Sequence, residues 1–137
     1  MLTTLFMRYP HFLALCILFT FWLGGCQKDD NSPTPISELT GRTWLLSYEE
    51  SQGNVEVYRP DTYVFPPSRG RTGFKLDANN SFTQLDIAPA DGIWPRPGKW
   101  VLLGTDILFI TLDDQPKINY KLHIISKKND VLKVERY

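Results

Sequence analysis

The chain is poor in the residues that build metal sites and disulfides. Of its 137 residues only two are cysteine, Cys16 and Cys26, and only two are histidine, His11 and His123. Cys16 and His11 belong to the first 25 residues, which we expect to be removed. A zinc-type site needs several His or Cys ligands. The sequence therefore predicts no metal site, no cofactor and no disulfide in the part of the chain that follows Cys26.

An excess of charge of one sign is also missing. Lys and Arg total 15, and Asp and Glu total 15. Removal of residues 1–25, which contain Arg8, leaves 14 basic residues against 15 acidic ones. A nearly neutral domain has no electrostatic reason to bind nucleic acid. The same balance argues against a polybasic lipid-binding surface.

The longest apolar run is too short to span a membrane. Residues 12–22 read FLALCILFTFW, eleven residues of which only Thr20 is polar. A spanning helix needs roughly 20 apolar residues, whereas a signal peptide needs a shorter run preceded by positive charge. Arg8 supplies that charge. The pattern predicts that residues 1–25 are a signal peptide that is cleaved after export.

The residues that follow this run resemble the lipobox of bacterial lipoproteins. Residues 23–26 read LGGC, and the resemblance implies that Cys26 is lipidated and becomes the first residue of the mature protein. The alternatives are an uncleaved membrane anchor and a chance cysteine after a plain signal peptide. Translation from Met7 instead of Met1 would put a Met-Arg pair ahead of the run, so both starts stay open.

A polar segment separates Cys26 from the rest of the chain. Residues 27–30 (QKDD) resemble the surface-export signal of lipoproteins in some Gram-negative lineages. We therefore expect anchoring in the outer membrane through the lipid, with exposure at the cell surface as a further expectation. The alternative is a merely soluble, charged tether. Residues 26–37 as a whole are expected to be the lipidated cysteine and a short tether.

The remaining residues, 38–137, show the two-residue period of β-strands. Trp44 and Leu46 alternate with more polar neighbours, and no stretch shows a convincing 3.6-residue period. Turn signals at 52–54, 77–80, 104–105 and 127–130 separate the runs. Strands are expected at 43–49, 55–58, 72–76, 81–87, 99–103, 106–112, 118–126 and 131–137. The spacing predicts an all-β domain, a small antiparallel meander closed into a barrel, with an open β-sandwich as the alternative.

The domain resembles the lipocalin-like lipoproteins of Gram-negative bacteria. Residues 39–44 (LTGRTW) open the strands, and residues 98–102 (GKWVL) resemble a second segment of that family. The first segment has Gly-x-x-Trp where lipocalins have Gly-x-Trp. The resemblance implies that Trp44 plugs one end of the barrel and that such barrels bind a small apolar ligand or a partner. Arg136 is expected either to pack on that Trp or to be solvated.

No group of residues in the domain predicts catalysis. His123 shares a strand face with polar residues, away from Leu122 and Ile124, so we expect it to be solvated. The acidic pairs 49–50 and 113–114 are adjacent in sequence, and adjacent strand residues point to opposite faces. We therefore expect no enzyme. A hydrolase would require several polar groups converging in one cleft.

Two irregular segments are the candidate binding elements. Residues 88–98 (APADGIWPRPG) are expected to form a stiff loop, and residues 66–71 (PPSRGR) are similar in kind. If both lie at one mouth of the barrel, four side chains could grip an anionic or carbohydrate-like ligand: Trp94, Arg96, Arg69 and Arg71. The alternative is that Trp94 folds inward as a lid while the arginines are solvated.

These observations lead to two functional hypotheses. The first is an outer-membrane, lipid-anchored protein whose non-enzymatic domain binds a small ligand or a protein partner through the barrel interior or mouth. The second is a structural or interaction lipoprotein with a fully packed barrel and no small-molecule ligand. In either case Trp44 and Trp100 are expected to be core residues, because each lies on an apolar alternating face.

Overall fold

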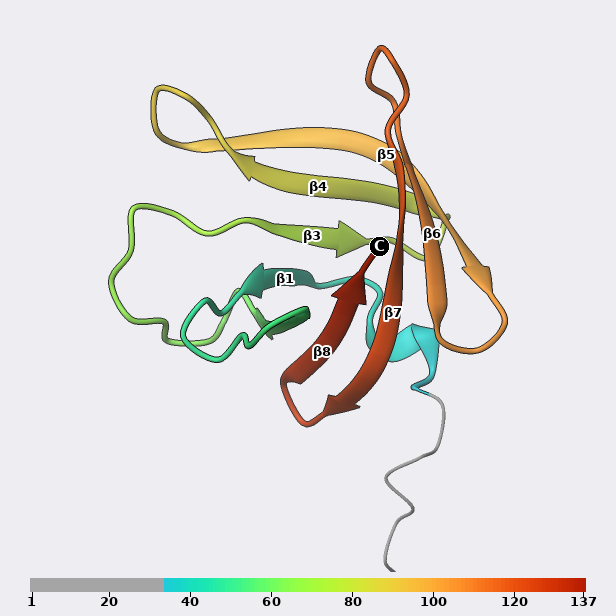
Figure 1. Ribbon diagram of the computed structural model, residues 1–137, viewed down its shortest axis with the longest axis horizontal. Coiled ribbons are helices and arrows are strands. Elements are labelled where there is room, and N and C mark those ends of the chain that lie inside the picture. The colour runs from blue at the N-terminus through green and yellow to red at the C-terminus, as the bar shows by residue number, and fades with distance from the viewer. Residues whose placement is uncertain (1–33) are drawn as a thin grey trace, which may run out of the picture. The chain divides into compact units, whose positions relative to one another are not determined.

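Figure 1 shows a computed structural model of the chain, which describes residues 34–137. The expected signal peptide, Cys26 and all but the end of the expected tether lie outside the described residues, so cleavage and lipidation stay predictions. Within residues 34–137, no helix combines the length and the apolar character that a membrane span requires.

The described residues form a short 3₁₀ helix, η1 (Ile36–Glu38), followed by eight strands. These are β1 (Thr43–Leu46), β2 (Val55–Pro60), β3 (Gly73–Leu76), β4 (Ser81–Ile87), β5 (Ile93–Leu103), β6 (Ile107–Leu112), β7 (Asn119–Lys128) and β8 (Val131–Arg136). They close into one antiparallel barrel in the order β1-β2-β8-β7-β6-β5-β4-β3. The predicted all-β antiparallel barrel is confirmed, and the sandwich alternative is not the fold observed.

One connection departs from neighbour-to-neighbour order. β1 pairs with both β2 and β3, so the segment 61–72 between β2 and β3 has to cross β1. Figure 1 shows this segment as a long irregular stretch beside β1. The other seam of the barrel pairs β2 with β8. The β1–β2 hairpin is therefore held on one side by β3, the next strand in sequence, and on the other by β8, the last strand.

Inward-facing side chains from the strands fill the core. Trp44 and Trp100 are 0% and 6% exposed, which confirms both as core residues. Their indole N–H groups donate to backbone carbonyls, that of Trp44 to Leu39 O (3.0 Å) and that of Trp100 to Asp77 O (3.0 Å). Each large ring is thus buried without an unpaired donor.

The two ends of the barrel differ. The closed end carries η1 and the turns that join β3 to β4, β5 to β6 and β7 to β8, and Leu39 is fully buried there. The opposite end, which we call the mouth, carries the segments 47–54, 88–92 and 113–118 together with Tyr137. Within residues 34–137 the strand ladders close on themselves and enclose a buried core, so this part has its own core and can fold alone.

Two glycines allow the barrel to turn its corners. A Cβ atom on Gly73 would overlap the carbonyl oxygen of Trp44, and one on Gly98 would overlap that of Thr111. Glycine is required where one strand approaches another this closely. Gly98 lies where β5 changes partners: β5 pairs with β4 alone before Gly98, with both β4 and β6 at Gly98 and Lys99, and with β6 alone from Trp100 onward.

The expected loop at residues 88–98 is wrong over its second half. Residues 93–98 are the first half of β5, paired in register with β4 from Ile87↔Ile93 onward. Asp113 N–H donates to the Pro97 carbonyl (3.0 Å), so the backbone of Pro97 faces away from β4. By the two-residue period that of Pro95 does too. Proline is tolerated there because the missing N–H falls on an edge without a ladder.

Candidate functional site

A chain of polar side chains lines the inner wall of the barrel at the mouth. Tyr120 donates its hydroxyl to Gln84 Oε1 (2.8 Å), and the Gln84 amide donates to both oxygens of Asp86 (2.8 and 2.9 Å). Arg96 donates to Asp86 (2.8 Å) and, through Nε (3.1 Å) and Nη2, to Asp114. Strands β4, β5 and β7 and the β6–β7 loop are thereby joined.

Arg136 continues this chain on the other side of the mouth. Its guanidinium lies 4.6 Å above the ring of Tyr120 and donates to the Tyr58 hydroxyl (3.4 Å), which in turn donates to Glu56 (2.8 Å). Arg136 thus packs on Tyr120 and not on Trp44. The cation over Trp44 is Arg42, at 5.8 Å. The mouth network, as we use the term, consists of Glu56, Tyr58, Gln84, Asp86, Arg96, Asp114, Tyr120 and Arg136.

Aromatic rings cross the barrel directly below this network. Tyr58 and Phe74 have ring centroids 4.9 Å apart, Phe74 and Phe82 5.8 Å, and Phe82 and Tyr120 6.4 Å. These four residues, the aromatic belt, come from β2, β3, β4 and β7. Because these rings meet inside the barrel, they fill part of its lumen.

Burial and ion pairing shift the pKa values of several residues of the mouth network. Burial raises the pKa of Tyr120 to about 12, and burial followed by the charge of Glu56 raises that of Tyr58 further. The hydrogen bonds that Arg96 donates to Asp114 and Asp86 raise the pKa of its guanidinium above the usual range. The hydroxyls therefore stay protonated and the arginine stays charged at neutral pH, so the hydrogen bonds within the network persist.

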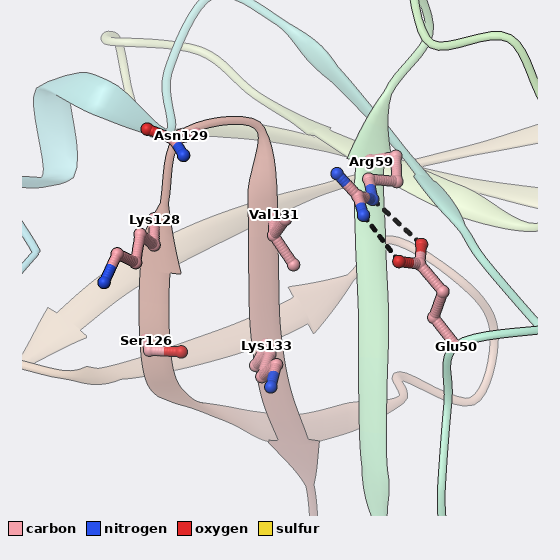
Figure 2. A pocket seen from close by; sticks show the side chains of 7 residues that line it. All are labelled: Glu50, Arg59, Ser126, Lys128, Asn129, Val131 and Lys133. Atoms are coloured by element: carbon pink, nitrogen blue, oxygen red, sulfur yellow. Dashed lines mark hydrogen bonds and ion pairs between the residues drawn. The ribbon is translucent and has the colours of Figure 1, made fainter.

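A second concave region lies on the outside of the barrel (Figure 2). It has a volume of about 380 Å³ and is bordered by side chains of β2, β7, β8 and the segment that follows β1. We call it the basic groove. Its lining residues are Glu50, Arg59, Ser126, Lys128, Asn129, Val131 and Lys133.

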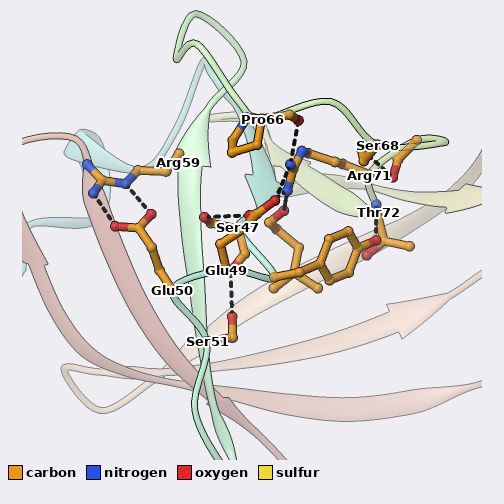
Figure 3. Close-up of polar contacts among 12 residues, drawn as sticks. Ser47, Glu49, Glu50, Ser51, Arg59, Pro66, Ser68, Arg71 and Thr72 are labelled. Atoms are coloured by element: carbon orange, nitrogen blue, oxygen red, sulfur yellow. Dashed lines mark hydrogen bonds and ion pairs between the residues drawn. The ribbon is translucent and has the colours of Figure 1, made fainter.

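Arg71 has a structural role that the sequence did not predict. It is 6% exposed and forms a bidentate ion pair with Glu49 (2.7 and 3.0 Å), as Figure 3 shows. Arg71 also donates to the carbonyls of Leu46 and Pro66, both at 3.0 Å, and its guanidinium lies 4.4 Å from the ring of Phe65 and 5.4 Å from that of Tyr48. The expectation that Arg71 grips a ligand is corrected, because its donors already hold the 61–72 segment against the end of β1.

The other three expected site residues lie in different surroundings. Trp94 is 53% exposed at the rim, in register with Asp86 and 5.8 Å from the Arg96 guanidinium. It is therefore not a lid buried over the core. Arg96 belongs to the mouth network, and Arg69 is exposed in the 61–72 segment. The sequence thus placed Trp94 and Arg96 together correctly, while Arg71 and Arg96 share no partner.

His123 and the two acidic pairs have separate partners and do not converge on one site. His123 Nε2 lies 3.1 Å from Asp106, near the closed end and away from the mouth. Glu49 binds Arg71 and Glu50 binds Arg59, so this pair is split between two partners as expected. In the second pair, Asp114 faces Arg96 whereas Asp113 is exposed.

Most of the mouth network was missed by the sequence analysis. Gln84 and Asp86 have the same parity as Phe82 in β4, so the alternation already placed them on the inner face. The signal was available, but a polar residue at the end of a strand is also typical of a solvated strand terminus. Their partners come from other strands, and the sequence alone did not indicate those pairings.

Comparison with known proteins adds no name to this geometry: no family model, no curated protein and no solved structure matches the chain. Among residues 34–137 there is also no group of three or more His, Cys, Asp or Glu side chains placed to hold a metal ion.

Proposed function

We propose that the protein is an outer-membrane lipoprotein, anchored through Cys26, whose barrel binds a ligand or a protein partner at its mouth and catalyses no reaction. The proposal modifies the first functional hypothesis in one respect. The binding surface is the rim around Trp94 and Arg96, and the barrel interior is not a ligand cavity.

The observation that carries the proposal is the exposed indole of Trp94 at the rim. The neighbouring Arg96 is held by carboxylates on two sides, and the lumen below is crossed by the aromatic belt. A large exposed ring on a strand beside a fixed guanidinium loses little conformational entropy on binding. Trp and Arg are also the residues that most often dominate binding interfaces.

Photo-crosslinking in intact cells tests this proposal. Replacing Trp94 with the photoreactive amino acid p-benzoylphenylalanine should give a defined adduct after irradiation, because the ring would lie in the interface. Val101 is the matched control, since it is 52% exposed on the same strand but has the outward-facing parity. The mass of the adduct distinguishes a small ligand from a protein. Equal labelling at both positions, or none at position 94, would contradict the proposal.

The anchor is tested separately through Cys26. Only its thiol can carry the diacylglycerol, and each buried methylene adds about 0.8 kcal/mol to membrane affinity. Cys26→Ser should therefore leave an unprocessed precursor that does not incorporate labelled palmitate. Undiminished labelling of this variant would show that the lipid is attached elsewhere.

A further inference from the structure

The basic groove concentrates positive charge that the net charge of the chain conceals. Three of its lining residues are cationic and only one, Glu50, is anionic (Figure 2). Ser126 and Asn129 add a hydroxyl and an amide. A near-neutral total predicted no lipid-binding surface, but a total says nothing about how charge is distributed over the molecule.

The single carboxylate of the groove is already engaged. Glu50 accepts two hydrogen bonds from the Arg59 guanidinium, at 2.8 and 2.5 Å. This pair fixes Arg59 along the wall of the groove. Lys133 is exposed on β8 and makes no hydrogen bond or ion pair with any described residue. A fixed arginine, an exposed lysine and neutral donors around one depression are groups that proteins use to bind phosphate.

Two ion pairs place the groove near the start of the described chain. Lys127 Nζ donates to Glu38 of η1 (2.6 Å), and Arg42 Nη1 donates to Asp130 in the β7–β8 turn (3.2 Å). The β7–β8 hairpin, which carries Lys128, Asn129 and Lys133, is thereby held beside η1. The groove accordingly lies on the outer wall formed by β2, β8 and β7 beside the closed end, where Glu50 reaches it from the segment 47–54. The Trp94 rim belongs to the opposite end.

This placement matters if Cys26 is lipidated, a step that rests on the proposed function. Thr34 follows Cys26 by eight residues, and an extended chain spans at most about 3.6 Å per residue. The closed end would then stay within roughly 30 Å of the bilayer. At that range a cationic groove meets lipid headgroups at high local concentration.

We propose that the basic groove binds the phosphate of an anionic lipid headgroup in the membrane that holds the anchor. The chemistry recognised is a phosphate ester, and the source is the bilayer and not a soluble phosphate. Binding there holds the outer wall of β2, β8 and β7 against the membrane and leaves the Trp94 rim accessible from the surrounding medium. A lipid tether alone would leave the orientation of the barrel free.

Vesicle flotation with the chain beginning at Gln27 tests the proposal. This chain retains the complete barrel and lacks the anchor, so its behaviour depends neither on lipidation nor on a mouth ligand. It should float with vesicles of phosphatidylglycerol in phosphatidylcholine but not with phosphatidylcholine alone. Lys133→Glu should weaken flotation about tenfold or more, since each basic residue near an anionic surface contributes substantially to affinity. The matched control is Lys117→Glu, an equal charge change at an exposed site at the mouth.

The outcomes are distinct. Loss of flotation in Lys133→Glu but not in Lys117→Glu supports a groove that binds lipid. Equal losses would show a general charge effect and overturn the proposal, as would absence of flotation by the unaltered chain. In a parallel titration with inorganic phosphate, shifts of the Asn129 amide resonance without any vesicle binding would assign the groove to a soluble phosphate and also overturn it.

Discussion

The three tryptophans of this domain differ in how well the sequence predicted their burial. Trp44 and Trp100 stand on alternating apolar faces and are buried, as predicted. Trp94 stands among prolines and could be interpreted either as a lid or as a binding group. The structure leaves its ring 53% exposed, because the β4–β5 hairpin continues past the point where β6 pairs with β5.

The free energy of unfolding should distinguish buried from exposed tryptophan. Trp44→Ala removes a fully buried ring and its hydrogen bond to Leu39, so it should lower stability by about 3–5 kcal/mol. Trp94→Ala should change stability by less than about 1 kcal/mol, as exposed substitutions usually do. Denaturant melts of the two variants provide the measurement. A large loss from Trp94→Ala would withdraw the rim as a binding surface.

The Glu49–Arg71 pair makes a prediction about acid stability. Hydrogen bonds from Arg71 lower the pKa of Glu49 from 4.5 to about 2. Because the folded pKa lies below the unfolded one, the pair stabilises the fold above about pH 4.5, and this contribution is lost as the pH falls toward 2. Glu49→Gln should therefore flatten the pH dependence of the unfolding midpoint in this window.

A matched variant makes this test specific to the ion pair. Asp91→Asn removes an exposed carboxylate in the β4–β5 turn, at a position with φ of 63° that asparagine tolerates. It should leave the pH profile close to that of the unaltered chain. If both variants flatten the profile equally, the acid sensitivity belongs to the overall charge and not to Arg71.

At the scale of the element, β5 shows why a strand was mistaken for a loop. Pro95 and Pro97 are incompatible with a strand that pairs on both sides, and the sequence contains nothing that marks an edge. The edge exists because β6 begins its pairing at Gly98. The length of β5 depends on where its neighbours in the sheet begin and end, and the local amino-acid composition does not indicate those positions.

The same prolines should keep the exposed edge of β5 from pairing with other chains. Pro95→Thr restores a backbone N–H on that edge and suits a strand by propensity. The variant should retain its fold by circular dichroism and show concentration-dependent self-association in analytical ultracentrifugation. Pro89→Thr, in the adjoining turn, should stay at the association state of the unaltered chain. A monodisperse Pro95→Thr variant would mean that proline does not protect this edge.

At the scale of the whole molecule, alternation and turn spacing were sufficient to predict a closed antiparallel barrel. They were not sufficient to predict its strand order, in which β2 lies between β1 and β8. Nor did they predict the mouth network, since Tyr120 and Gln84 lie on β7 and β4 and are 36 residues apart. Short-range sequence patterns predict individual strands. The mouth network takes side chains from five strands, which come together only when the barrel closes.

Because the aromatic belt crosses the lumen, we expect the unaltered domain to have no room for an apolar ligand. Removing one ring should create that room. Phe82→Ala should cost about 3–5 kcal/mol and leave an apolar cavity, and such cavities bind small apolar molecules. Chemical-shift titration with benzene should show saturable binding by this variant and none by the unaltered chain. Phe109→Ala, on the outward-facing parity of β6, is the control. Equal binding by the unaltered chain would restore the lumen as a ligand site.

The position of the β1–β2 hairpin has a consequence for how fast the barrel assembles. Strands β3 to β8 pair with their neighbours in sequence and can form progressively, one hairpin after another. The hairpin must instead join β3 on one side and β8 on the other, and the second seam brings Val55 opposite Glu135, 80 residues away. Bringing residues so far apart in sequence together costs chain entropy before the contacts between them can offset that loss. Insertion of this hairpin should therefore be the slow step, and the stretch from β3 to β8 should spend the longest time with both of its edges open.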